Sequence, residues 1–215
     1  MRGEVLVISE EHRRAGQVIA THLLSMGRRK MVVAIGGESG AGKTAIAHVV
    51  SKTMKSAGMV AKVINLDNYY RVEPAERNEW RKEHGLESIG PEEYDWELIR
   101  RHIDAFLADG EAELPCVDIL TDQVDLLRTT FKGIPFLILD GLYPLLLDAD
   151  VKIHLDSEHN KILRAQELRG KEKLDDFRID VLDREHEATK KLRRYADFIL
   201  TKDFELVEQK RDSRF

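Results

Sequence analysis

The chain has 215 residues, of which 42% are hydrophobic, and a formal net charge of -5. This length and composition suit one ordinary domain, or one domain with a small appendage, that buries a real core. The charge offers no basic field for nucleic acid, no apolar run approaches the roughly 18 residues of a membrane span, and the N-terminus lacks a signal-peptide core. Cys116 is the single cysteine, which excludes an internal disulfide and makes a cytoplasmic setting the default.

The first 30 residues precede the strongest motif of the chain. We expect a short strand over residues 4–8 and a helix from an N-cap at Ser9 to about Met26, with Gly27 ending it. The domain division that follows is a strand–helix extension over residues 1–30, a core domain over 31–204 and a C-terminal tail over 205–215. The extension is expected to cover an edge of the sheet.

A phosphate-binding loop follows the apolar, β-branched run of residues 31–36, which predicts a buried strand. Its residues fit the pattern G-x-x-x-x-G-K-[ST] at every fixed position: Gly37, Glu38, Ser39, Gly40, Ala41, Gly42, Lys43 and Thr44. Glycines let backbone N–H groups wrap a polyphosphate, and the N-terminus of the helix behind them adds its positive dipole end. Lys43 can reach the β- and γ-phosphates and the Thr44 hydroxyl can hold Mg²⁺, so the motif predicts ATP and Mg²⁺ as cofactors.

A second core strand is expected over residues 60–66, and it leads directly into Asp67. Ligands in open α/β sheets gather beyond the carboxyl ends of the strands. Asp67 is therefore a candidate base for an acceptor hydroxyl, a candidate Mg²⁺ contact, or both, the alternative being an aspartate that only caps a turn. Neighbouring side chains expected to bind the acceptor are Tyr70 and Arg71, with Asp118 and Asp122 further along.

The middle of the chain is less informative. Residues 73–90 are strongly charged and predict a helix and loop outside the sheet, and Pro91 is expected to start another helix that Gly110 ends. Residues 113–118 predict a strand or ribbon. Asp122 and Asp125 are then expected in a loop.

An apolar run over residues 136–139 ends in Asp140, which matches a strand-end carboxylate that holds Mg²⁺. Further strands are expected over residues 151–155 and 198–200, the latter being the last. The basic region between them favours a lid at about residues 164–176. Arg164 and Arg169 are its candidates for neutralising the transferring phosphoryl group, although a solvated helix face also explains many of these charges.

Four segments in this order resemble the uridine kinase, phosphoribulokinase and pantothenate kinase branch of P-loop kinases, with uridine kinases most similar. They are residues 36–44, 66–71 (LDNYYR), 91–99 (PEEYDWELI) and 139–143 (LDGLY). The resemblance implies a P-loop α/β fold, a three-layer α/β/α arrangement around a mainly five-stranded parallel sheet with a helical lid. It also implies ATP·Mg²⁺ as donor, a small-molecule hydroxyl as acceptor, Asp67 as catalytic aspartate and Asp140 as the Walker B acid.

The chain departs from uridine kinases at their nucleoside contacts. Ile89 stands where they carry a ribose-binding aspartate, Val117 replaces a base-binding tyrosine, and Asp122 replaces a histidine. Phosphoryl transfer survives these changes, but uridine as the substrate does not follow from the sequence.

Two alternatives to a kinase stay open: a nucleotide-dependent switch without an acceptor, and a binding module that has lost its acceptor site. A GTPase would carry an N/T-K-x-D guanine reader, which residues 201–204 (TKDF) lack at the final position. The sequence leaves the acceptor and the choice of ATP or GTP undetermined, and it leaves room for a homo-oligomer.

Overall fold

A six-stranded sheet forms the centre of the protein in this computed structural model, which describes residues 2–3, 5–28, 30–156 and 175–209. The strand order is β2-β5-β1-β6-β7-β8, with bounds β1 (Met31–Gly37), β2 (Ala61–Asn65), β5 (Phe136–Gly141), β6 (Val151–Leu155), β7 (Phe198–Leu200) and β8 (Leu206–Glu208). The first five strands in this order run parallel, and β8 pairs antiparallel with β7. The expected α/β fold around a mainly parallel sheet is confirmed.

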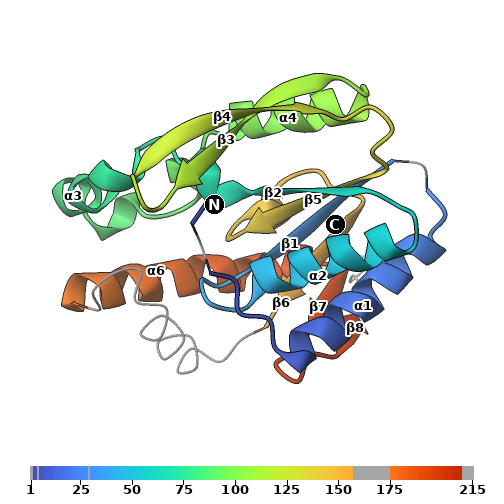
Figure 1. Cartoon of the computed structure of the whole chain (residues 1–215). Coiled ribbons are helices and arrows are strands. Elements are labelled where there is room, and N and C mark those ends of the chain that lie inside the picture. The colour runs from blue at the N-terminus through green and yellow to red at the C-terminus, as the bar shows by residue number, and fades with distance from the viewer. Residues whose placement is uncertain (1, 4, 29, 157–174, 210–215) are drawn as a thin grey trace.

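Helices cover both faces of the sheet, which explains why β1 and β5 are buried along their whole lengths. On one face, α1 (Glu10–Ser25) and α2 (Lys43–Ser56) pack against each other and against the odd-numbered side chains of β1, such as Val33 and Ile35. On the other, α4 (Trp96–Leu107) and α6 (Asp176–Leu192) pack around Val32 and Leu139 (Figure 1). The expected N-terminal helix is thus part of the main core.

A second layer of structure lies over α4. The hairpin of β3 (Glu111–Asp118) and β4 (Gln123–Thr130) forms a separate two-stranded sheet, and α3 (Pro74–His84) lies beside it in Figure 1. Short 3₁₀ turns connect the elements at η1 (Leu66–Tyr69), η2 (Leu86–Ser88), η3 (Pro91–Glu93), η4 (Pro144–Leu146) and η5 (Arg193–Tyr195).

The structure differs from two sequence expectations between residues 91 and 125. Pro91 starts a 3₁₀ turn rather than a long helix, and α4 begins only at Trp96, where the Asp95 carboxylate accepts a hydrogen bond from the Leu98 N–H at 2.9 Å. Tyr94 between them is extended and buried, which interrupts the helix. Asp125, expected in a loop, lies in β4 because it pairs with Cys116 of β3.

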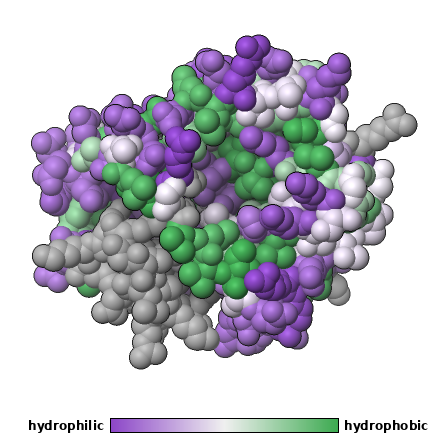
Figure 2. All heavy atoms as spheres, viewed as in Figure 1, coloured by the Kyte–Doolittle hydropathy of each residue, from purple (hydrophilic) through white to green (hydrophobic). Residues whose placement is uncertain are grey.

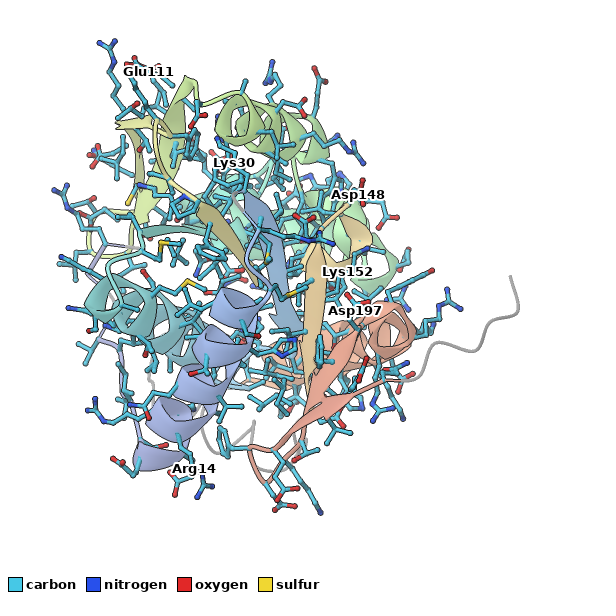
Figure 3. The ribbon with its side chains drawn as sticks, turned by 90° about the vertical axis from the view of Figure 1, so that its right-hand side faces the viewer. Arg14, Lys30, Glu111, Asp148, Lys152 and Asp197 are labelled. Carbon is cyan, nitrogen blue, oxygen red and sulfur yellow. The ribbon has the colours of Figure 1, made fainter. Side chains whose placement is uncertain are left out.

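The chain ends differently from the sequence expectation. Phe198–Leu200 is not the last strand, because a turn over residues 201–205 reverses the chain and residues 206–208, expected in a tail, form β8. In that turn the Thr201 N–H donates to the Glu205 carbonyl at 2.8 Å, and Phe204 has φ +61°. Asp197, just before β7, fixes the neighbouring strand β6: its carboxylate accepts from the Lys152 N–H at 2.9 Å, and Figure 3 shows the two residues side by side.

The expected strand over residues 4–8 is absent from the described part of that segment. Arg2 makes an isolated bridge to Asp118 of the hairpin, and residues 5–9 then run as irregular chain to α1. Val5 and Val7 leave 83% and 77% of their surface exposed, since no sheet edge receives them. Figure 2 shows hydrophobic atoms exposed in the middle of the face over which this segment runs in Figure 1. Among the described helices, none has the length and apolar character needed to span a bilayer.

Candidate active site

The phosphate loop connects the carboxyl end of β1 to α2 with the backbone geometry that its glycines allow. Gly40 and Gly42 have φ angles of +90° and +84°, which L-residues with side chains rarely adopt. At Gly37 an added Cβ would lie only 2.8 Å from the Leu155 carbonyl oxygen of the neighbouring strand β6. Both constraints explain the glycines without a ligand. The resulting backbone path is of the kind that can line a cradle for an anion.

Lys43 and Thr44 form the first turn of α2, where unbonded helix N–H groups and the positive end of the dipole lie. The Lys43 side chain is buried, and its Nζ donates to the Glu38 carbonyl oxygen at 2.7 Å, back across the loop. A buried ammonium group held against the loop is positioned to meet phosphate oxygens.

Asp140 lies at the carboxyl end of β5, the strand next to β1, and its residue is 0% exposed. The Asn65 side-chain amide donates to its carboxylate at 3.3 Å. A fully buried carboxylate that lines the same groove as Thr44 suits a hard cation, because Mg²⁺ prefers oxygen ligands. The residues present therefore fit the expected Mg²⁺ site at Thr44 and Asp140.

A groove of about 260 Å³ brings these groups together with the hairpin. It runs along the edge of β2 between α2 and β3. Its walls are Leu6, Thr44, His48, Lys62, Val63, Ile64, Asn65, Asn68, Tyr69, Leu114, Pro115, Cys116, Leu127 and Asp140. Thr44 and Asp140 thus open into one cavity, and a residue of the N-terminal segment, Leu6, closes part of it.

Asn65 is a site residue that the sequence interpretation missed. Its side-chain oxygen accepts from the Asp67 N–H at 2.8 Å, while its side-chain nitrogen donates to Asp140. It therefore fixes the start of η1, and with it Asp67, relative to the expected metal carboxylate. The signal was available: Asn65 is a polar residue at the carboxyl end of β2, directly after the apolar Val63 and Ile64.

Asp67 belongs to a second group of side chains, built around Tyr70 and Tyr94. Burial raises the pKa of both tyrosines, and the nearby Asp67 carboxylate adds to this effect. The Tyr94 hydroxyl donates to the Tyr70 hydroxyl at 2.7 Å, and the guanidinium of Arg77 lies 3.6 Å from the centre of the Tyr70 ring. Tyr70, predicted to bind the acceptor, is thus held beside the predicted base.

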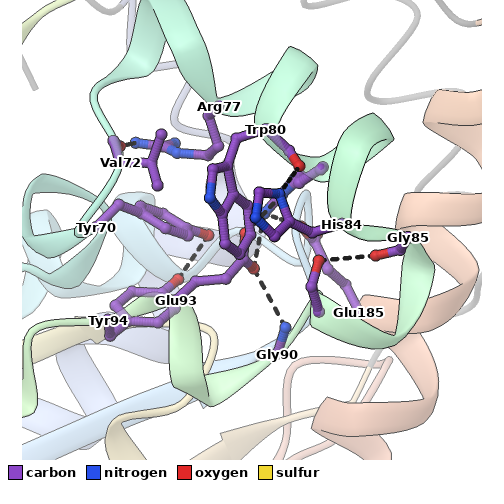
Figure 4. A network of polar contacts seen from close by, with 12 residues as sticks. Tyr70, Val72, Arg77, Trp80, His84, Gly85, Gly90, Glu93, Tyr94 and Glu185 are labelled. Atoms are coloured by element: carbon purple, nitrogen blue, oxygen red, sulfur yellow. Dashed lines mark hydrogen bonds and ion pairs between the residues drawn. The ribbon is translucent and has the colours of Figure 1, made fainter.

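Behind these tyrosines lies a buried ion cluster, part of the network in Figure 4. Arg81 of α3 makes a two-pronged contact with Glu93, with N···O distances of 2.6 and 3.0 Å, and lies 3.6 Å from Glu185 of α6. Burial raises the pKa of Glu185, while Arg178 and Arg81 oppose this shift. The sequence analysis placed Arg81 in a charged helix and loop outside the sheet, and it attributed most charges of the region around Glu185 to a solvated helix face. It did not predict that these residues meet.

The remaining predicted acceptor residues take structural positions. Arg71 donates from Nε to the Tyr94 carbonyl at 3.1 Å, and Asp118 accepts from the Leu120 N–H at 2.9 Å in the turn of the hairpin. Asp122 lies in the same turn with φ +55°. Their acceptor roles stay predictions, and Arg164 and Arg169 lie outside the described residues.

Ile89 and Val117, which the sequence resemblance predicts to stand at nucleoside-contact positions of uridine kinases, are both buried, at 1% and 4% exposure. Neither side chain can donate or accept a hydrogen bond. Two positions that could recognise ribose and base by polar contacts are therefore apolar in this protein.

Comparison with known proteins gives a consistent family assignment. The family described as "PRK: Phosphoribulokinase / Uridine kinase family" matches residues 32–194. A "Uridine kinase" of Halobacterium salinarum is 27% identical over 183 residues, covering 78% of each chain, and a "Uridine kinase" of Deinococcus deserti is 26% identical, covering 66% of this chain and 72% of the relative.

Solved structures show the same fold. A putative fructose transport system kinase from Silicibacter superposes with a TM-score of 0.63 at 16% identity, covering 83% of this chain and 93% of the other. A D-glycerate 3-kinase from Cryptococcus neoformans superposes with a TM-score of 0.59 at 12% identity, covering 94% and 99%. The names of these two kinases refer to different small molecules, fructose and D-glycerate, so the fold does not identify the acceptor.

Proposed function

This chain belongs to the phosphoribulokinase/uridine kinase family, so it is a small-molecule kinase, and we propose that it transfers the γ-phosphoryl group of ATP to a hydroxyl of an acceptor other than uridine. The observation that carries this proposal is the convergence of Thr44 and Asp140 on one groove beside the phosphate loop. A loop that binds phosphates and a metal-binding carboxylate are both needed for phosphoryl transfer from ATP.

The residues of the chain divide the work as follows. The loop N–H groups and Lys43 bind the β- and γ-phosphates and hold them against the start of α2. Thr44 and Asp140 would hold Mg²⁺, with Asp67 as a further contact, and the bound ion would supply neutralising charge between the phosphates. Arg164 and Arg169 are proposed to add positive charge as the phosphoryl group moves.

Asp67 is proposed to orient the acceptor hydroxyl and take its proton. It follows β2 directly, at the edge of the sheet where the phosphate loop also lies, and Asn65 fixes its backbone. A base must come within about 3 Å of the proton it removes, directly or through one water. Tyr70 and Arg71, which follow Asp67 in the chain, are proposed to contact the acceptor, with Asp118 and Asp122 of the hairpin turn.

A metabolite screen tests the function. The protein would be incubated with ATP·Mg²⁺ and a panel of hydroxyl acceptors, including sugars, hydroxy acids and nucleosides, and phosphorylated products would be detected by mass spectrometry. A kinase gives ADP release that depends on one acceptor class. Nucleotide turnover that no acceptor stimulates would instead support a switch or a module without an acceptor.

A further inference from the structure

The N-terminal helix α1 precedes the family match, which begins at residue 32, yet its first turn touches the phosphate loop. A Cβ added to Gly42 would lie 2.4 Å from His12 Nε2. The tip of the imidazole is therefore in contact with the residue that precedes Lys43. Among the described contacts of the loop glycines, His12 is the side chain that comes from a helix outside the family match.

The orientation of this imidazole is fixed by its own helix cap. The Ser9 N–H donates to His12 Nδ1 at 3.1 Å, and the Ser9 hydroxyl accepts from the His12 N–H at 3.3 Å. Since Nδ1 accepts a hydrogen bond, the neutral ring carries its proton on Nε2. The Nε2 end of the ring thus lies against the loop at Gly42.

A second aromatic residue stands beside His12. Phe204, in the turn that joins β7 to β8, packs edge-on against the imidazole, with ring centroids 5.2 Å apart and planes at 89°. This turn follows the carboxyl end of β7, the edge of the sheet from which the phosphate loop also leaves β1. Loops at this edge surround the ligand in open α/β sheets.

The segment before α1 also lies along the site. Arg2 is tied to the hairpin through its backbone, its N–H donating to the Val117 carbonyl at 2.8 Å. Leu6 then lines the groove with Thr44 and Asp140, and His12 meets the phosphate loop. Figure 1 shows this dark blue segment descending past the start of α2 to α1.

We propose that α1 completes the donor-nucleotide site: His12 Nε2–H donates to the phosphate chain at the Gly42 side of the loop, and Phe204 forms an apolar wall for the base. The inference rests on the proposed function, because it assumes that the loop binds a nucleoside triphosphate. A neutral imidazole suits this task, since a donor that faces phosphate oxygens gains a charge-assisted hydrogen bond.

Calorimetric titration of the full chain with ATP·Mg²⁺ and ADP·Mg²⁺ tests the proposal. His12→Ala is expected to lower the affinity for both nucleotides about tenfold or more, the scale for losing a hydrogen bond to a charged group. His12→Gln, whose amide nitrogen replaces Nε2, should recover part of the loss. His12→Asn, whose nitrogen replaces Nδ1, should not, and it carries the test if the alanine variant does not fold.

His22→Ala is the matched control. His22 lies on the same helix and packs edge-on against Phe198, with ring centroids 4.7 Å apart, but Phe198 begins β7 at the opposite end from the phosphate loop. This variant loses the same kind of ring contact, and its nucleotide affinity should be unchanged.

Three outcomes would overturn the inference. Unchanged nucleotide affinity in a folded His12→Ala protein with a lower Tm would make His12 a packing residue only. Increased affinity would show that the imidazole blocks the site. If the unaltered protein bound neither nucleotide, the proposed function would fail first, and the role of His12 with it.

Discussion

Lys43 shows at the scale of one residue how the fold prepares a charge for function. Its ammonium group is buried, and one of its N–H groups donates to the Glu38 carbonyl oxygen at 2.7 Å, back across the phosphate loop. A phosphate chain in the loop would offer charged oxygen acceptors to this ammonium group. The residue is therefore held ready for an anion.

Replacing Lys43 tests this position. Lys43→Ala should leave the fold intact and abolish tight ATP·Mg²⁺ binding, because Ala keeps the helix but removes the charge that meets the phosphates. Isothermal titration would measure the affinity, and Lys55→Ala, an exposed lysine in the last turn of the same helix, is the control. Unchanged affinity in Lys43→Ala would mean that the phosphate site is wrongly assigned.

Asp67 gives the sharpest prediction about chemistry. Asp67→Asn keeps the side-chain shape and the hydrogen bond of its backbone to Asn65, but it removes the proton acceptor. We expect kcat to fall by about 10² or more, the usual scale of general-base assistance, with ATP affinity measured separately at saturating Mg²⁺.

Asp104→Asn, on the exposed face of α4, should leave kcat unchanged. Near-normal turnover of the true acceptor by Asp67→Asn would remove Asp67 from the mechanism.

At the scale of elements, the Arg81–Glu93–Glu185 cluster joins three segments that no backbone hydrogen bond among the described residues connects to the main sheet. α3 supplies Arg81, η3 supplies Glu93 and α6 supplies Glu185, so the cluster fixes the helices around Tyr70. A buried ion cluster contributes little net stability when complete, but losing one partner is costly.

Removing the central arginine, Arg81, should therefore destabilise the fold strongly. Arg81→Met is expected to lower the free energy of unfolding by about 3–5 kcal/mol, because Glu93 would stay buried without its paired cation and Glu185 would lose one of the two arginines that offset its burial. Urea unfolding measures this. The double variant Arg81→Met/Glu93→Leu should be more stable than Arg81→Met alone; equal or lower stability would contradict the account of the cluster.

Glu185 adds a pH dependence whose sign follows from its raised pKa. A carboxyl with a higher pKa in the folded than in the unfolded state favours folding while protonated, and this contribution is lost as the pH rises above its ordinary value of 4.5. Glu185→Gln removes the titration. The stability of Glu185→Gln relative to the unaltered protein should increase between pH 4.5 and 7, as measured by thermal unfolding of both proteins across this range. A difference in Tm that stays constant with pH would contradict the prediction.

At the scale of the whole molecule, the parallel sheet brings the groups predicted to bind ATP·Mg²⁺ together at the carboxyl ends of its strands. The hairpin and the helices around Tyr70 surround the predicted acceptor side. Asp140 and Asn65 pair in the β2–β5 register, which explains how a strand far along the chain meets the phosphate loop. We predict that the choice of acceptor depends on residues brought in by several elements, among them the buried Ile89 and Val117.

These two apolar positions predict that nucleosides are poor acceptors. A site built to hydrogen-bond a substrate hydroxyl can discriminate by about 10⁴ or more, and an apolar side chain forfeits that advantage. Uridine and cytidine should show kcat/KM below about 10⁴ M⁻¹s⁻¹ in a coupled ADP-release assay. Efficient uridine phosphorylation would refute this reading of Ile89 and Val117.

The sequence by itself determined the parts of this protein whose chemistry is local. The phosphate loop needs glycines at fixed spacing between a buried strand and a helix, and the strand-end acids Asp67 and Asp140 follow apolar runs, so residues close in the chain suffice to predict them. Only the tertiary structure decided the contacts between distant segments. Arg81 meets Glu185 across more than one hundred residues, β8 forms because a turn folds residues 206–208 back on β7, and His12 reaches Gly42 through the packing of α1 on α2. Local pattern cannot reveal such contacts, because a charged or aromatic side chain has the same sequence signature whether it faces water or a partner brought close by the fold.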